Sequence, residues 1–121
     1  MKKPRWKTEP DEHDYAAAAQ YLSLSEDSKR EIEHTIHLLR NAKCSKYFAK
    51  DIVRVARLPL LPISNKHVVR NLGRIRRKEL LSPVLLVRGS RGNPLVIADG
   101  YHRVCAVYHA SEDDVVECRI A

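Results

Sequence analysis

The stretch 96–106 constrains the fold of this chain more than any other part of the sequence. Three apolar residues run directly into Asp99 and Gly100, and a polar cluster and a short apolar-periodic segment follow. This pattern predicts a buried strand that ends at Asp99, a sharp turn at Gly100, and a helix with His102 and Arg103 in its first turn. The turn leaves backbone N–H groups unpaired at the positive end of a helix, where an anion is stabilised. We therefore predict a phosphate or carboxylate site here.

Hydrophobic spacing predicts further elements on both sides of this turn. Apolar residues recur at helical spacing in four segments, which are 11–22, 28–40, 46–56 and 66–78. Ser28 and Glu31 fit a capping box at the start of the second of these helices. Strands are predicted over 58–63, 84–88, 94–98 and 115–120. The segments 84–88 and 94–98 should form a β-hairpin, and the whole pattern indicates an α+β fold.

The order of these elements predicts three regions. Residues 1–10 are basic, contain two prolines and have no periodicity, so we expect a mobile basic arm. Residues 11–57 form a helical N-terminal segment. The prolines and branched residues of 58–63 cannot continue a helix and suit an extended edge strand, so a second region should span 58–121.

Composition favours an anionic partner and a reducing compartment. The formal net charge is +7, but one tryptophan, five tyrosines and one phenylalanine give few platforms for stacking single-stranded bases. Three cysteines without a CxxC pair argue against a disulfide framework and favour a cytoplasm of bacterial type. Since no apolar run approaches the length of a bilayer span, we expect no membrane association.

The predicted helix over 66–78 is the most basic element of the chain. Its buried stripe is Val68, Leu72 and Ile75, and its other faces carry cations: Lys66, Arg70, Arg74, Arg77 and Lys78. Four of these, Lys66, Arg70, Arg74 and Arg77, are candidates for an anion or nucleic-acid surface. A solvated face that balances acidic surface elsewhere explains the same pattern equally well.

Residues 58–121 resemble the ParB/sulfiredoxin superfamily. The run Ala98-Asp99-Gly100-Tyr101-His102-Arg103, followed by Ala106, is similar to the Asp-Gly-His-His-Arg-x-x-Ala signature of ParB-like proteins, which include free-serine kinases. The preceding segment 81–87 resembles the Leu-x-x-Pro-Ile-x-Val strand of the same superfamily. The resemblance covers about half of the chain and implies a small mixed sheet with the N-terminal helical segment packed on it.

The resemblance also implies a nucleotide or phosphate site. It places Gly100, Tyr101, His102 and Arg103 around a nucleotide of the ATP or CTP type, and the guanidinium shape suits bidentate phosphate binding. Asp99 and His102 are the expected catalytic residues, and Asp99 is the expected ligand of Mg²⁺.

Two departures from the superfamily pattern bear on the chemistry. Tyr101 stands where sulfiredoxins carry a catalytic cysteine, so reduction of a sulfinic acid by that route is not expected. The residues 64–66, Ser-Asn-Lys, stand where the serine kinases carry a glutamate base. The base would therefore be Asp99, His102 or a residue of the helical segment.

Other interpretations of these residues stay open. His102, Cys105 and His109 share one face of the predicted helix and, with Cys118, offer zinc ligands, but their spacing matches no common zinc pattern and the cysteines suit a core. His102 and Arg103 can also be explained as partners of the acidic loop 112–114. Two function classes remain: a nucleotide-dependent phosphotransferase or hydrolase, and a non-catalytic module that binds nucleotide, DNA or a protein, with the N-terminal helices available for a homodimer.

Overall fold

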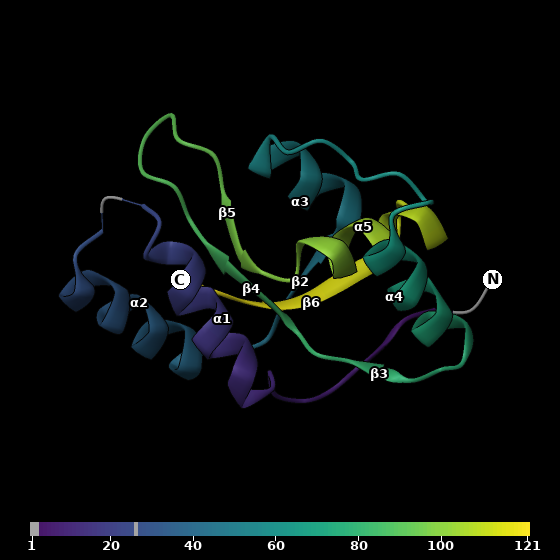
Figure 1. The fold of residues 1–121 in the computed structure, drawn as a ribbon, viewed down its shortest axis with the longest axis horizontal. Helices are drawn as coiled ribbons and strands as arrows, with labels where there is room; N and C mark the ends of the chain where they lie inside the picture. The colour runs from purple at the N-terminus through teal and green to yellow at the C-terminus, as the bar shows by residue number, and fades with distance from the viewer. Residues whose placement is uncertain (1–2, 26) are drawn as a thin grey trace.

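A four-stranded mixed sheet lies at the centre of the fold in the computed structural model, which describes residues 3–25 and 27–121 (Figure 1). Its strands are β2 (Ser45–Phe48), β4 (Val84–Val87), β5 (Val96–Asp99) and β6 (Val115–Ile120). They follow the order β2–β6–β4–β5. β6 pairs antiparallel with β2 and parallel with β4, and β4 and β5 form the predicted antiparallel hairpin.

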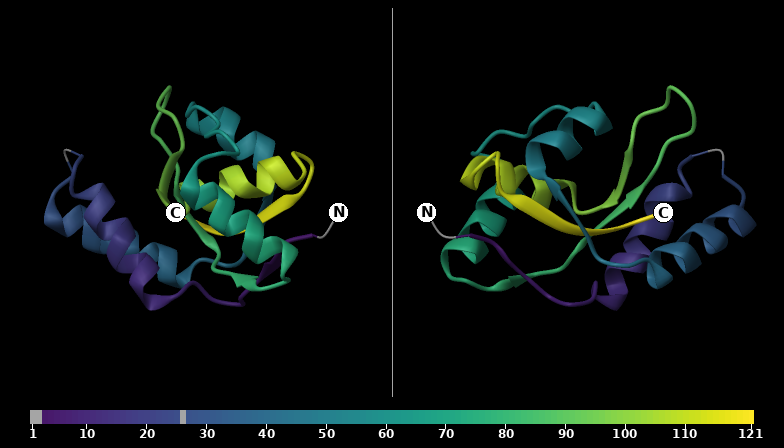
Figure 2. Two further views of the ribbon diagram at one scale, coloured as in Figure 1. Left: turned by 45° about the vertical axis from the view of Figure 1, so that its right-hand side comes forward. Right: turned by 180° about the vertical axis from the view of Figure 1, so that it is seen from behind.

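Helices cover both faces of this sheet (Figure 2). One face carries α3 (Ala49–Ala56), α4 (Lys66–Arg76) and α5 (Tyr101–Ala110). The other face carries α1 (Glu12–Leu22) and α2 (Lys29–Asn41). The sheet is therefore the middle layer of three, which fits an α+β chain whose inner strand β4 is apolar on both sides.

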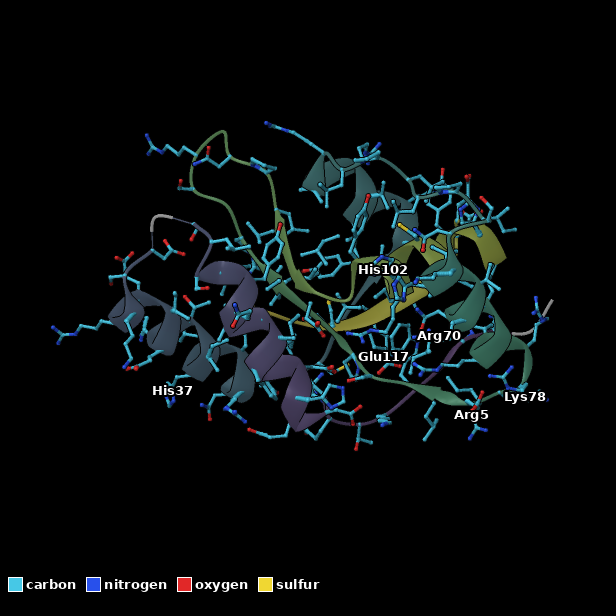
Figure 3. The ribbon with its side chains drawn as sticks, in the orientation of Figure 1. Arg5, His37, Arg70, Lys78, His102 and Glu117 are labelled. Carbon is cyan, nitrogen blue, oxygen red and sulfur yellow. The ribbon has the colours of Figure 1, made fainter. Side chains whose placement is uncertain are left out.

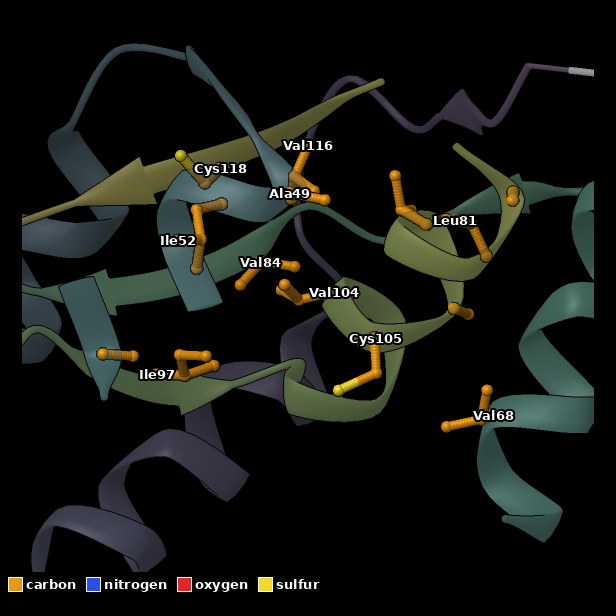
Figure 4. Packing of buried hydrophobic residues seen from close by; sticks show 14 of the residues in the cluster. Ala49, Ile52, Val68, Leu81, Val84, Ile97, Val104, Cys105, Val116 and Cys118 are labelled. Atoms are coloured by element: carbon orange, nitrogen blue, oxygen red, sulfur yellow. The ribbon is translucent and has the colours of Figure 1, made fainter. Parts of the chain in front are cut away.

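The sequence of β4 explains this layering. Its side chains alternate between the two faces. Val84, labelled in Figure 4, and Leu86 join the core beneath α3, α4 and α5. Leu85 and Val87 pack towards α1 and α2. Burying both faces removes a large apolar area from water, at about 25 cal/mol per Å². β4 consequently lies inside the sheet, and the prediction of a central strand is confirmed.

Most of the predicted helices are confirmed. α1 and α2 lie within one or two residues of their predicted bounds, and Ser28 and Glu31 form the expected capping box at the start of α2. α5 begins directly after Gly100, and α4 begins after Asn65, whose Oδ1 accepts hydrogen bonds from the amides of His67 and Val68. α4 ends at Arg76, two residues earlier than predicted.

The prediction of a helix over 46–56 is wrong in its first turn. Residues 45–48 form β2, and α3 begins only at Ala49. Ser45 pairs with Cys118 and Phe48 with Val115, so hydrogen bonds to a strand far along the chain override the local helical spacing. The aromatic pair Tyr47-Phe48 favours a strand over a helix.

The predicted edge strand over 58–63 is also wrong. This segment is an extended connection whose carbonyl groups bind side chains and a turn amide instead of a strand. The Pro59 carbonyl accepts a hydrogen bond from the Tyr101 hydroxyl, and the Pro62 carbonyl accepts one from the Asn65 amide. Because the two prolines have no N–H group to donate, the segment cannot form a regular ladder. Its leucines still pack against the core.

Residues 5–10 of the predicted mobile arm lie against the fold. Arg5–Trp6 form β1, which pairs in parallel with β3 (Leu80–Leu81). Arg119, which is almost fully buried, donates a hydrogen bond of 2.6 Å to the carbonyl of Thr8. Residues 1 and 2 lie outside the described residues.

The predicted boundary between 57 and 58 does not divide the core. β2 and α3 precede it, yet β2 pairs with β6 near the end of the chain and α3 packs on the same face as α4 and α5. Ile52 before the boundary and Val68 after it belong to one buried cluster. The helical N-terminal segment therefore supplies one edge strand and part of the core of the C-terminal region.

The cap of α4 gives a first prediction. Asn65→Ala removes the acceptor of two backbone N–H groups and should lower the free energy of unfolding by about 1 kcal/mol. Asn65→Asp keeps a side-chain oxygen at this position and should retain most of the stability. Urea denaturation of the three proteins measures the difference, and an unchanged midpoint for Asn65→Ala would show that the cap contributes nothing.

Candidate anion-binding site

The turn between β5 and α5 is built on Gly100. Its φ of +110° lies in a region that residues with a side chain rarely adopt. A Cβ atom at this position would lie 2.8 Å from Cγ2 of Val84 and 2.8 Å from Nη2 of Arg103. The glycine thus permits both the backbone turn and the close approach of these two side chains.

Arg103 lies between two carboxylates at this turn. Its Nη2 donates a hydrogen bond of 2.9 Å to Oδ2 of Asp99, and Oδ2 of Asp14 lies 4.0 Å from the same nitrogen. Asp14 is buried and accepts a hydrogen bond from the hydroxyl of Ser82, which in turn accepts one from the amide of Asp11. This network joins α1, the start of β4, the end of β5 and α5.

The environment of Asp99 shifts its acidity. Burial raises the pKa of the Asp99 carboxyl above its ordinary value, the neighbouring Arg103 opposes this rise, and Asp14 adds to it. A raised pKa disfavours the ionised carboxylate, so the contribution of Asp99 to folding stability is present at low pH and is lost as the pH rises through this pKa.

A cleft of about 170 Å³ opens beside this turn, between α4 and α5. Its lining consists of His67, Arg70, Asn71, Arg74, Asp99, Gly100, His102 and Arg103. The four residues from α4 are spaced at i, i+3, i+4 and i+7, which places them on one helix face. The two helices lie side by side, with His102 on one and Arg70 on the other (Figure 3). The cleft therefore holds three guanidinium groups and a single carboxylate.

Several polar groups of the cleft have no partner within the described residues. The side chains of Arg70 and Arg74 make no hydrogen bond or ion pair there. Oδ1 of Asn71 and Nε of Arg103 are buried and have no hydrogen-bond partner within the described residues. Asn71 is only 7% exposed, and its amide nitrogen donates a hydrogen bond to the His67 carbonyl. Buried polar groups are usually hydrogen-bonded, so these two atoms are exceptions within the lining of the cleft.

His102 is the second group of the cleft whose acidity is perturbed. Its ring centroid lies 4.7 Å from that of His67. Burial lowers the pKa of His102, and the charges of His67 and Arg103 lower it further. His102 is therefore neutral at pH 7, and its ring can accept a proton or donate one N–H to an anion.

The structure brings together part of the predicted site. Asp99, Gly100, His102 and Arg103 line the cleft, and Arg70 and Arg74 of the basic helix face them. The other predicted residues, Tyr101, Lys66 and Arg77, do not line it: the Tyr101 hydroxyl donates to the Pro59 carbonyl, and Arg77 pairs with Glu79 at 2.7 Å.

Sequence reasoning missed three residues of this region. His67 and Asn71 line the cleft, and the spacing His67-x-x-Arg70-Asn71-x-x-Arg74 was the signal that could have found them, because it forms a polar stripe beside the apolar one. Asp14 lies in the first turn of α1, where an acidic residue is ordinary. Its burial against Ser82 and Arg103 depends on contacts between distant segments, which no local pattern shows.

The residues around the turn do not make a metal centre. No group of three or more His, Cys, Asp or Glu side chains converges as ligands in the part of the chain that the structure describes. Cys105 and Cys118 are fully buried in the apolar core, and Nε2 of His109 lies 2.7 Å from the Leu61 carbonyl. At Asp99 the ligand set does not fit Mg²⁺ either, since Arg103 occupies one oxygen and the lining adds two further arginines but no second carboxylate.

Comparison of the chain with protein-family models, with curated proteins and with solved structures finds no match. The resemblance to the ParB/sulfiredoxin superfamily consequently stays a prediction from the motif. No helix within residues 3–25 and 27–121 is long and apolar enough to cross a bilayer.

Substitution of Gly100 tests how the turn is built. Gly100→Ala combines a strained φ with contacts at 2.8 Å, and we expect it to lower the free energy of unfolding by about 1–3 kcal/mol. Gly92→Ala is the matched control, because Gly92 also has a positive φ, +75°, but nothing lies within 4 Å of its Cβ position. Chemical denaturation should show the larger loss for Gly100→Ala; equal losses would contradict the crowding at the turn.

Proposed function

We propose that the cleft between α4 and α5 binds the phosphate group of a nucleotide or another phosphate ester. The observation that carries this proposal is the pair Arg70 and Arg74, whose side chains have no partner in the described ranges and which face the N-terminus of α5. Guanidinium groups match phosphate geometry, and a helix N-terminus adds free N–H groups and a positive dipole. The unsatisfied Asn71 and Arg103 atoms support it independently.

The size of the cleft limits which part of the ligand is enclosed. Sites that enclose a drug-sized molecule measure about 300–1,000 Å³, and this cleft measures about 170 Å³. It has room for a phosphate group and a few further atoms. We therefore propose that the terminal phosphate of a nucleotide enters the cleft while its base lies outside.

The charges of the cleft define the role of each residue. Because Arg103 already pairs with Asp99, Arg70 and Arg74 are the residues that would neutralise the charge of the phosphate. His67 and His102 lie beside each other and can donate hydrogen bonds to the remaining phosphate oxygens. Neutralisation of the phosphate is thus assigned to α4, and no step is assigned to a metal at Asp99.

For phosphoryl transfer or hydrolysis, His102 is the better candidate base. Its lowered pKa keeps the ring neutral near pH 7, and its side chain makes no hydrogen bond within the described residues. Asp99 instead has one oxygen occupied by the hydrogen bond from Arg103. This assignment follows the motif resemblance for His102 and departs from it for Asp99.

One observation favours nucleic acid as a second candidate. Pairing of β1 with β3 brings Arg5 next to the end of α4, where its Nη1 donates a hydrogen bond of 3.2 Å to the Lys78 carbonyl. In Figure 3, Arg5 and Lys78 lie past the C-terminal end of α4, and Arg70 lies on the helix itself. Cationic side chains therefore continue past the cleft. A surface of this kind would follow a phosphate backbone.

Charge removal on α4 separates these two proposals. Arg70→Gln and Arg74→Gln should each weaken the binding of ATP, CTP or pyrophosphate about tenfold, since each variant loses one charge-assisted contact. Lys66→Gln is the matched control, because it removes one charge from the same helix outside the cleft. Isothermal titration calorimetry measures all three.

The pattern of losses decides the outcome. Losses confined to Arg70→Gln and Arg74→Gln support the phosphate cleft. Lys66→Gln could instead lose as much affinity as the two arginine variants, and the affinity for duplex DNA could fall steeply with salt. These two results together would favour the nucleic-acid surface over the phosphate cleft. Unchanged affinity in both arginine variants would exclude the cleft as the site.

The acidity of His102 predicts a pH dependence of binding. An anion in the cleft favours the imidazolium form and raises the lowered pKa of His102, so binding takes up a proton. Affinity for sulfate, whose own charge is constant here, should rise as the pH falls from about 7.5 to about 5.5. The slope should be smaller in His102→Gln. Titrations at several pH values test this, and a slope that is unaffected by the substitution would assign the proton to another group.

A further inference from the structure

A second pocket lies at the opposite end of β4, between α3 and the β4–β5 hairpin. Its volume is about 220 Å³. Strands β2, β4 and β6, helix α3 and the hairpin each contribute to its lining, which consists of Tyr47, Asp51, Ile52, Val55, Leu86, Arg88, Leu95 and Ile120. No residue of the phosphate cleft takes part, so the two sites are separate.

The floor and walls of this pocket are apolar. Leu86 of β4 and Ile52 of α3 are almost fully buried beneath it. Tyr47 and Val55 are 41% and 52% exposed, so the apolar surface continues to the opening. An apolar ligand would cover this surface and gain about 25 cal/mol for each Å² removed from water.

Two charged residues line the pocket, and only one of them lacks a partner. Asp51 accepts a hydrogen bond of 2.9 Å from Arg54, which balances its charge. The side chain of Arg88 makes no hydrogen bond or ion pair within the described residues, although its backbone amide donates to the Ala121 carbonyl. The pocket therefore combines an apolar body with one exposed arginine whose side chain has no partner within the described residues.

The pocket lies at one end of the central sheet. β4 and β6 run parallel, and Arg88 and Ile120 lie at their carboxyl ends, so both strands contribute to the lining at the same end.

We propose that this pocket binds a small carboxylic acid with an apolar body, whose carboxylate pairs with Arg88. An apolar cavity of about 150 Å³ holds a benzene molecule, so 220 Å³ accommodates a ring with a short carboxylate arm. The guanidinium supplies a bidentate partner for the carboxylate, and the floor at Leu86 and Ile52 receives the ring.

Titration of the 121-residue chain with 3-phenylpropanoate tests this proposal. Methyl resonances of Val55, Leu86 and Ile120, followed by NMR, should shift and saturate. The neutral amide of the same acid should bind about tenfold more weakly. Arg88→Gln should lower the affinity for the acid by a similar factor. Arg91→Gln is the matched control, because Arg91 is exposed in the same hairpin loop but does not line the pocket.

Each outcome bears on the proposal. Saturating shifts at the pocket that depend on both the carboxylate and Arg88 support it. It is overturned if no shifts occur up to about 10 mM acid, or if the shifts map to residues outside the pocket. Equal binding of the acid and the amide, or a loss in Arg91→Gln as large as in Arg88→Gln, overturns it as well. None of these results depends on the phosphate cleft.

Discussion

The Arg103 guanidinium lies between two carboxylates that belong to different layers of the fold. Asp99 is the last residue of β5, and Asp14 belongs to α1 on the other face of the sheet. Ser82, which lies just before β4, donates a hydrogen bond to Asp14. Desolvating such charges is costly, and removing one partner of a buried pair typically costs about 3–5 kcal/mol because the other charge stays unpaired. The position of the turn at Gly100 therefore depends on Arg103 of α5, which contacts both Asp99 of β5 and Asp14 of α1.

This network changes what the motif arginine does. An arginine beside a glycine turn suggests a direct phosphate contact, but in this fold Asp99 accepts its hydrogen bond and only 14% of its side chain is exposed. Arg103 accordingly organises the turn, and the cations that we propose to meet a ligand come from α4. The cleft is an assembly of two helices that are distant in the sequence, and it forms only when the core beneath them is packed.

The sequence predicted the elements whose signals are local. The alternation in β4, the capping box at Ser28 and the strand–glycine–helix order around Gly100 depend on neighbouring residues, and each is present. β2 was missed because its pairing with β6 joins residues about 70 positions apart. The site was predicted only in part. Its turn was found, and His67 and Asn71 belong to a local polar stripe that the prediction did not include, whereas Asp14 takes its role from tertiary contacts.

The position of both candidate sites follows from the burial of the sheet. Because helices cover its two faces, the inner strand β4 carries apolar side chains along its length, and polar groups follow where the chain leaves β4 and β5. At one end of β4, Val84 packs against Gly100 beside the cationic cleft; at the other end, Arg88 follows the last strand residue beside the apolar pocket. The same apolar strand that stabilises the core thus separates two sites of different chemistry.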